Sequence, residues 1–151
     1  PITHSRIRML NDPDTNDGNP FLAADADGSS GLMMVEYVAA GAIAEIRNAA
    51  QPAAAGTLVL SRGAEEDATF ASQGAQQLER SIAAYRVLLC CELVGVVRLM
   101  RQRKLDTQFT GVVGDALALA ATLPRGVEDR DLRGDIALAE SLLDDIGRLV
   151  G

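Results

Sequence analysis

Residues 72–103 read SQGAQQLERSIAAYRVLLCCELVGVVRLMRQR, and this stretch decides the fold. Its apolar residues recur at positions 78, 82, 85, 89, 93, 96 and 100, and spacings of three and four place them along one stripe of an α-helix. At 1.5 Å per residue a helix of this length extends about 45 Å, which exceeds the usual helix of a globular protein. The stretch therefore predicts an all-α fold built as a bundle of long helices.

A second core helix is predicted over residues 31–49. The run LMMVEYVAAGAIAEI within it is apolar on nearly every face, and its only charges are Glu36 and Glu45. Ser30 precedes the run and is a residue type that favours the N-cap position. Because residues 31–49 and 87–100 are apolar all round, we expect that one chain cannot cover them alone.

The rest of the chain is organised around these two helices as one domain over residues 1–151. Two shorter helices are predicted at about 108–122, ending before Pro124, and at about 135–149, with Asp135 as the N-cap. Residues 11–31 are crowded with Asn, Asp, Gly and Pro and are interpreted as a loop packed by Phe21 and Leu22. The expected division is an N-terminal loop region (1–30), core bundle helices (31–104) and peripheral helices (105–151).

The composition restricts the classes of partner. The chain of 151 residues has a net charge of −7, and it contains no cluster of Lys and Arg interleaved with aromatic residues, so a nucleic acid is an unfavourable partner. Neither a signal peptide nor an uninterrupted apolar span is found, which argues against export and against a membrane. The adjacent Cys90 and Cys91 are poorly placed for a mutual disulfide and favour a reducing, cytoplasmic location.

Metal and nucleophile sites have little support in the pattern. The segment from Asp25 to Glu36 imitates a calcium loop, but Ser30 stands where such a loop requires glycine. His4 has no Cys or carboxylate at ligand spacing and is interpreted as an exposed histidine. Cys90 and Cys91 lie among leucines, where a thiol is usually an inert small hydrophobe.

Two sets of carboxylates remain as candidates. Glu92 lies within the apolar run 87–100, so its charge is expected to be paired, with Arg86, with Arg98 or with a neighbouring chain, unless it acts in catalysis. The triplet of Glu65, Glu66 and Asp67 follows the loop of residues 51–64. On its own the triplet is explained as acids that favour a helix N-terminus.

The order of several motifs resembles the C-terminal third of the histidine and phenylalanine/tyrosine ammonia-lyase family. The segment SGLM at residues 30–33 is followed by Ala39, Ala40, Glu45 and Pro52 at similar spacing, and NDPDTNDGNPFLAADADGSSG before it resembles the Pro-Phe-Leu loop of that family. The resemblance resumes at Leu78, at residues 89–95 around Glu92 and, more weakly, at residues 131–149.

The resemblance implies an active-site carboxylate after Pro52. An alignment without gaps places it at Glu65, and a shift by one residue places it at Glu66. A glutamate there can accept the imidazole N–H of a histidine substrate, whereas a phenyl ring offers no such donor. Histidine is therefore slightly favoured as the substrate, while a phenylalanine or tyrosine lyase or an aminomutase is the alternative.

The same resemblance implies what this chain does not contain. The methylidene-imidazolone prosthetic group of the family forms from an Ala-Ser-Gly tripeptide, and the nearest strings here are Ser29-Ser30-Gly31 and Ala71-Ser72-Gln73. The chain is therefore expected to be a fragment or subunit of a lyase that is inactive alone. It is expected to act within a homotetramer or with a companion lyase chain, and a non-catalytic helical assembly module is the rival interpretation.

Overall fold

The computed structural model describes residues 2–57, 59, 61–64 and 70–151. Every regular element among them is a helix, which confirms the predicted all-α class. The α-helices are α1 (Ile2–Asn11), α2 (Pro13–Asn16), α3 (Met33–Ala49), α4 (Ala71–Gln102), α5 (Gly111–Leu119) and α6 (Arg133–Val150). Short 3-10 turns are η1 (Pro20–Leu22), η2 (Ala53–Gly56), η3 (Ser61–Gly63) and η4 (Ala120–Thr122).

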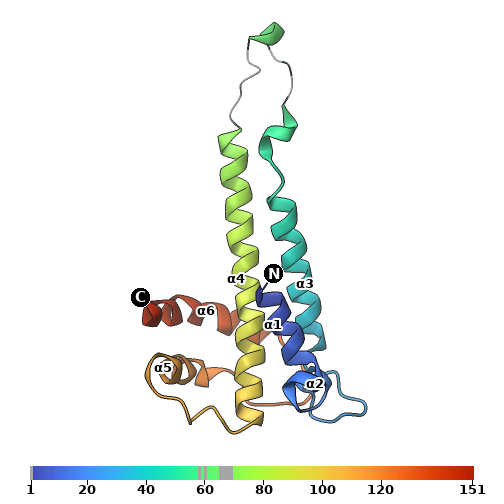
Figure 1. Cartoon of the computed structure of the whole chain (residues 1–151), viewed down its shortest axis with the longest axis vertical. Coiled ribbons are helices and arrows are strands. Elements are labelled where there is room, and N and C mark those ends of the chain that lie inside the picture. The colour runs from blue at the N-terminus through green and yellow to red at the C-terminus, as the bar shows by residue number, and fades with distance from the viewer. Residues whose placement is uncertain (1, 58, 60, 65–69) are drawn as a thin grey trace.

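A long hairpin of α3 and α4 forms the axis of the molecule (Figure 1). The two helices lie side by side and run in opposite directions. Helices α1 and α6 pack against the lower half of α4, and α5 packs against α6. The upper half of the hairpin stands clear of these other helices (Figure 1). Both predicted core helices are confirmed, α4 almost to the residue.

The core lies on a different face of α4 from the stripe that the spacing emphasised. Ala84, Leu88, Cys91, Val94 and Gly95 are buried against α3 and α1, whereas the stripe residues near the upper end are exposed. Both faces of α4 carry apolar residues. The positions of the helices that pack against α4, and not its own periodicity, therefore determine which face is buried. The exposed stripe residues are Leu78 (60%), Ile82 (52%) and Tyr85 (48%).

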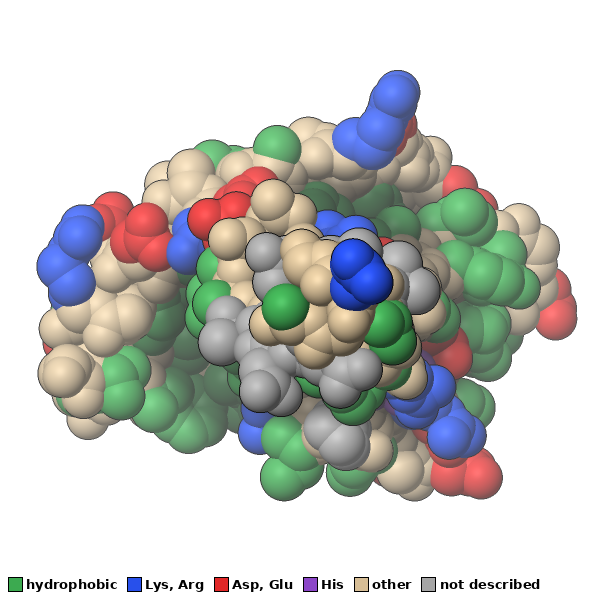
Figure 2. Space-filling model, turned by 90° about the horizontal axis from the view of Figure 1, so that it is seen from above, with side chains coloured by type: hydrophobic (Ala, Val, Ile, Leu, Met, Phe, Trp, Pro, Cys, Tyr) green, Lys and Arg blue, Asp and Glu red, His purple; other side chains and the backbone are tan. Residues whose placement is uncertain are grey.

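Apolar side chains also remain on the surface of α3. Met34, Tyr37 and Val38 are exposed, and Figure 2, a view down the hairpin, shows apolar side chains in several surface patches around it. The prediction that one chain leaves apolar surface uncovered is therefore correct for α3. It is wrong for most of residues 87–100, because α1, α3 and α6 cover that part of α4.

Three expectations are corrected, one about a predicted loop and two about the N-caps of helices. Residues 1–30 are not a loop throughout, because α1 and α2 occupy much of them, although Leu22 is fully buried as expected. Leu32 and not Ser30 precedes the first turn of α3, and Ser30 supplies a carbonyl that accepts from Met33 N. Asp135 lies inside α6 and not at its cap. Among the described residues, no helix is long and apolar enough to span a membrane.

Candidate functional site

The segment that was predicted to carry the active-site carboxylate connects α3 to α4 at the far tip of the hairpin (Figure 1). Glu65 and Glu66 themselves lie outside the described residues. Helix α4 begins at Ala71, four positions after Asp67, so its first turn contains no acidic residue.

Two polar contacts join the ends of α3 and α4 just below this connection. Gln77 Nε2 donates to the carbonyl oxygen of Gln51 at 3.0 Å. One turn further down, Arg80 Nε lies 3.7 Å from Glu45 Oε1. The packed hairpin thus holds both ends of the connection close together while its tip extends away from the rest of the chain.

A second group of polar residues lies at the opposite end of the hairpin, where the loop before α6 crosses the start of α3. The carboxylate of Asp129 accepts hydrogen bonds from Ser29 Oγ (2.9 Å), Ser30 N (2.8 Å) and Gly31 N (2.9 Å). These donors lower the pKa of Asp129, with the two backbone amides as the largest cause. The contact ties the loop to α3 across about a hundred residues of sequence.

Gly31 has a local reason to be glycine at this contact. Its φ is +50°, and a Cβ atom there would lie 2.5 Å from the carbonyl oxygen of Phe21. No side chain fits that approach without moving backbone. The close packing of residues 21–23 on residue 31 therefore presents the amides of Ser30 and Gly31 to Asp129.

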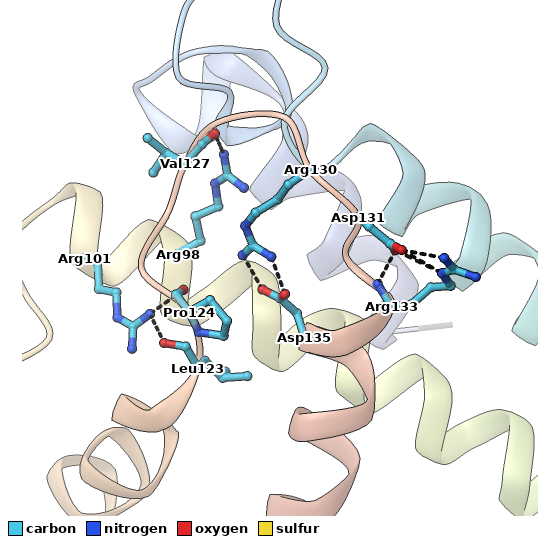
Figure 3. Close-up of polar contacts among 9 residues, drawn as sticks. All are labelled: Arg98, Arg101, Leu123, Pro124, Val127, Arg130, Asp131, Arg133 and Asp135. Carbon is cyan, nitrogen blue, oxygen red and sulfur yellow. Dashed lines mark hydrogen bonds and ion pairs between the residues drawn. The ribbon is translucent and has the colours of Figure 1, made fainter.

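The same loop is fixed to α6 and α4 by arginines (Figure 3). Arg130 forms a bidentate ion pair with Asp135, and both N···O distances are 2.5 Å. The Asp135 side chain is only 5% exposed, so this pair is nearly buried. Arg101 donates to the carbonyl oxygens of Leu123 and Pro124, and Arg98 donates to that of Val127. The loop thus crosses α4, and the guanidinium groups of Arg98 and Arg101 on α4 hold it by hydrogen bonds to its carbonyl oxygens.

An open groove of about 640 Å³ lies between α3, this loop and α6. Met34, Val35 and Val38 of α3 and Ile136 of α6 form apolar walls. The charged residues at its rim are already engaged within the chain, Asp131 with Arg133 and Arg130 with Asp135. The groove therefore offers apolar contact without a free charge for a polar substrate.

Comparison with known proteins places these features in a family. Residues 1–121 match the sequence profile of the family described as aromatic amino acid lyase. The chain belongs to this family. Because the match covers α1 to α5 and the connection between α3 and α4, it includes the whole long hairpin of the lyase fold.

The chain is similar over nearly its whole length to histidine ammonia-lyases. It is 29% identical over 150 residues to that of Natranaerobius thermophilus, covering 99% of this chain and 29% of that protein. It is 30% identical over 154 residues to that of Streptomyces avermitilis, covering 99% of this chain and 29% of that protein. The chain therefore spans less than a third of the length of the lyases that it matches.

A solved structure supports the fold over the same extent. The crystal structure of histidine ammonia-lyase from Trypanosoma cruzi superposes with a TM-score of 0.86 at 23% identity, over 99% of this chain and 30% of that chain. The hairpin and the helices around its lower half thus have the arrangement found in a lyase. This likeness concerns the fold.

Within the lyase fold, Glu92 is part of the packing between helices. Its side chain is 14% exposed and forms an ion pair with Arg6 of α1. The expected pairing is confirmed, but the partner is neither Arg86, which pairs with Asp144, nor Arg98. The ion pair with an arginine between α1 and α4 accounts for the nearly buried charge of Glu92.

The structure also describes the surroundings of the other candidates. Burial raises the pKa of Cys90 to about 11 and that of Cys91 to about 12, so both thiols stay protonated near neutral pH. Among the residues that the structure describes, no group of three or more His, Cys, Asp or Glu is placed to hold a metal ion. Glu36, the last residue of the imitated calcium loop, accepts from Asn11 Nδ2. His4 is half-buried, which differs from the expected exposure.

Sequence reasoning missed the contacts of the loop before α6. The only signal is the alternation of charge in DRDLRGD at residues 129–135, which is typical of a solvated segment as well. Nothing in that pattern pairs Asp129 with residues 29–31 or separates the buried Asp135 from the exposed Asp131. These assignments need the tertiary arrangement.

Proposed function

We propose that this chain is the C-terminal part of an ammonia-lyase that eliminates ammonia from an aromatic amino acid, with histidine as the favoured substrate. One observation carries the proposal. The similarity to histidine ammonia-lyases extends over 99% of the chain, including the connection that bears the acidic triplet. Membership of the lyase family and the matching fold support it.

The proposed contribution of the chain to the reaction is one carboxylate. Glu65 accepts the imidazole N–H of a bound histidine and so orients the substrate, and Glu66 takes this role if the alignment is shifted by one residue. A buried carboxylate is unfavourable beside a phenyl ring, which offers no donor in return. A carboxylate in this position therefore selects histidine over phenylalanine.

The electrophile of the reaction belongs, in this proposal, to the part of the lyase outside this chain. When present, the methylidene-imidazolone group withdraws electrons from the substrate. The residues here do not fit it, because neither Ser29-Ser30-Gly31 nor Ala71-Ser72-Gln73 is the Ala-Ser-Gly precursor. The amides of Ser30 and Gly31 are also engaged by Asp129. The 151 residues alone are therefore expected to be inactive.

Assembly is part of the same proposal. The exposed apolar side chains of α3 and of the upper part of α4 favour a homo-oligomer, with a tetramer expected in a cytoplasmic enzyme. A companion lyase chain that carries the electrophile is the alternative way to complete the site. The non-catalytic helical assembly module is the rival function, since the same apolar surface would support assembly of a lyase or of such a module.

The test uses the lyase assembled from this chain and the polypeptide that carries Ala-Ser-Gly. Glu65→Gln preserves the shape but removes the charge, so histidine turnover should fall on the order of 10² to 10⁴ fold. Glu66→Gln is the matched control, and it should be mild if the gapless alignment holds. The thermal midpoint should hardly change in either variant.

Three outcomes separate the alternatives. If only Glu66→Gln loses activity, the active-site carboxylate is Glu66 and not Glu65. If neither variant affects turnover, the triplet has no role in the reaction. Urocanate or cinnamate produced by the purified 151-residue chain would refute the assignment of the electrophile to another segment, and an assembly without any lyase activity would favour the non-catalytic module.

A further inference from the structure

The connection between α3 and α4 begins with a carbonyl group that is bound by a side chain of the opposite helix. Pro52 follows Gln51 and has no N–H, so the backbone hydrogen bonds of α3 stop there. In the next turn, η2, Ala55 N donates to the carbonyl oxygen of Pro52 at 3.0 Å. The carbonyl oxygen of Gln51 instead accepts from Gln77 Nε2 on α4, also at 3.0 Å.

Residues 51–57, which we call the entry arm, run from the end of α3 along α4. Gln77 lies in the second turn of α4 and is half-buried, and η2 packs against the same helix. Among the described residues, Gln77 makes the single hydrogen bond between the entry arm and α4. The other hydrogen bonds of the arm stay within it or reach the last turn of α3. The direction in which the arm leaves the hairpin therefore depends on Gln77.

The ion pair one turn below does not replace this hydrogen bond. Arg80 Nε lies 3.7 Å from Glu45 Oε1, and these side chains are 60% and 42% exposed. An ion pair so accessible to solvent contributes little and fixes no direction. The hydrogen bond of Gln77 has an ordinary length and ends on one carbonyl oxygen, so it defines the position of the arm.

The position of the entry arm matters because of the proposed function, on which the next step rests. The proposed carboxylate, Glu65 or Glu66, belongs to the same connection and lies outside the described residues. Orientation of a substrate is sensitive to distance, and a misplacement of about 1 Å costs on the order of 10² fold in rate. An arm that leaves the hairpin in a defined direction therefore favours catalysis.

We propose that Gln77 is a positioning residue of the lyase. Its side-chain amide holds the entry arm against α4 and thereby orients the connection that carries the carboxylate. Gln77 acts through the arm and not on the substrate. The role requires an N–H donor, so Gln77→Lys, which retains one, should preserve it, whereas Gln77→Met has a similar length and no donor.

Amide hydrogen exchange of the 151-residue chain, measured by NMR, tests the contact without any lyase activity. Ala55 N and Thr57 N donate to carbonyl oxygens within the arm, so their exchange reports its local opening. Gln77→Met should accelerate this exchange about two- to fivefold, the effect of losing one partly exposed hydrogen bond. Gln76→Met, at the exposed neighbouring position, is the matched control and should leave it unchanged.

Kinetics of the assembled lyase test the positioning role. Gln77→Met should lower kcat for histidine about two- to tenfold without changing the thermal midpoint, and Gln77→Lys should restore it. In an enzyme that already carries Glu65→Gln, or Glu66→Gln if that is the active carboxylate, Gln77→Met should have no further effect, because the group that it positions is gone. Equal losses in both backgrounds would show a merely structural role and contradict the proposal.

Failure of the positioning role and failure of the proposed function give different results. Unchanged hydrogen exchange in Gln77→Met overturns the role of Gln77, whatever the activity of the lyase. If exchange is faster but neither Glu65→Gln nor Glu66→Gln affects turnover, the proposed carboxylate is wrong, and the catalytic role of Gln77 is overturned with it. Faster exchange together with a loss of kcat that depends on the carboxylate supports both.

Discussion

The ion pair of Arg130 and Asp135 should contribute more to stability than any other ion pair of the loop before α6. Asp135 is 5% exposed and receives two N–H groups at 2.5 Å, whereas Asp131 is 58% exposed and pairs with the exposed Arg133. The two aspartates are four residues apart in the same segment, so they form a comparison matched in chemistry and location.

Replacing Asp135 by Asn retains the shape and leaves the charge of Arg130 without a partner. Breaking a nearly buried pair in this way costs about 3 kcal/mol, because one ion remains partly desolvated. For a domain of this size the loss corresponds to roughly 6–12 °C in the thermal midpoint. Asp131→Asn should leave the midpoint nearly unchanged, since solvent already surrounds that pair.

Urea unfolding followed by far-UV circular dichroism measures both variants at one protein concentration. A double variant, Arg130→Met with Asp135→Leu, adds a third comparison, because apolar replacement of a buried pair is often neutral. It should recover most of the stability that Asp135→Asn loses. Equal midpoints for Asp135→Asn and Asp131→Asn would refute the reasoning that burial separates the two pairs.

Three further outcomes follow from single sites. Cys90 and Cys91 should resist a thiol reagent at pH 8 in the native chain and react quickly in urea, because their pKa values lie at about 11 and about 12; rapid native labelling would contradict their burial. The pKa of Asp129 is lowered in the folded chain, so its contribution to the free energy of unfolding is present above the unfolded pKa near 3.8 and is lost as the pH falls through the lower folded value. Asp129→Asn should therefore flatten the acid limb of a stability-versus-pH curve. An unchanged acid limb would count against the contact of Asp129 with residues 29–31. Gly31→Ala should destabilise the folded chain by about 1–3 kcal/mol or more, because residue 31 has a positive φ and lies against backbone atoms. Gly41→Ala, in the open middle of α3, should instead stabilise the folded chain by about 0.5–1 kcal/mol. Equal unfolding midpoints for the two variants would show that residue 31 is not constrained.

The prediction of the helices succeeded where the signal is local. Residues 72–103 and 31–49 carry long apolar runs without a proline, and α4 and α3 occupy nearly the same ranges. The start of the chain was missed because α1 is short and has few apolar residues. Its sequence, ITHSRIRMLN, becomes a helix with Ile7 buried against the hairpin, a contact that its own pattern does not reveal.

The candidate site was predictable only in part. The position of the acidic triplet after the loop, and its match to a family position, are properties of the sequence, and Glu65 and Glu66 remain predictions. The partner of Glu92 was not predictable, because Arg6 lies 86 residues away and Arg86 and Arg98 are closer in sequence. Ion pairs between helices depend on which helices meet, and sequence distance carries no information about that.

The sequence by itself determined that this chain is helical, that helices near residues 31–49 and 72–103 form the core and that its motifs follow the order of the lyase family. These properties depend on backbone hydrogen bonds within each helix and on local apolar content, so they are encoded residue by residue. The tertiary structure alone decided which face of α4 is buried and which carboxylates are paired. Those outcomes depend on contacts such as Asp129 with Ser30 and Arg98 with Val127, between segments that are far apart in the chain and meet only after it has folded.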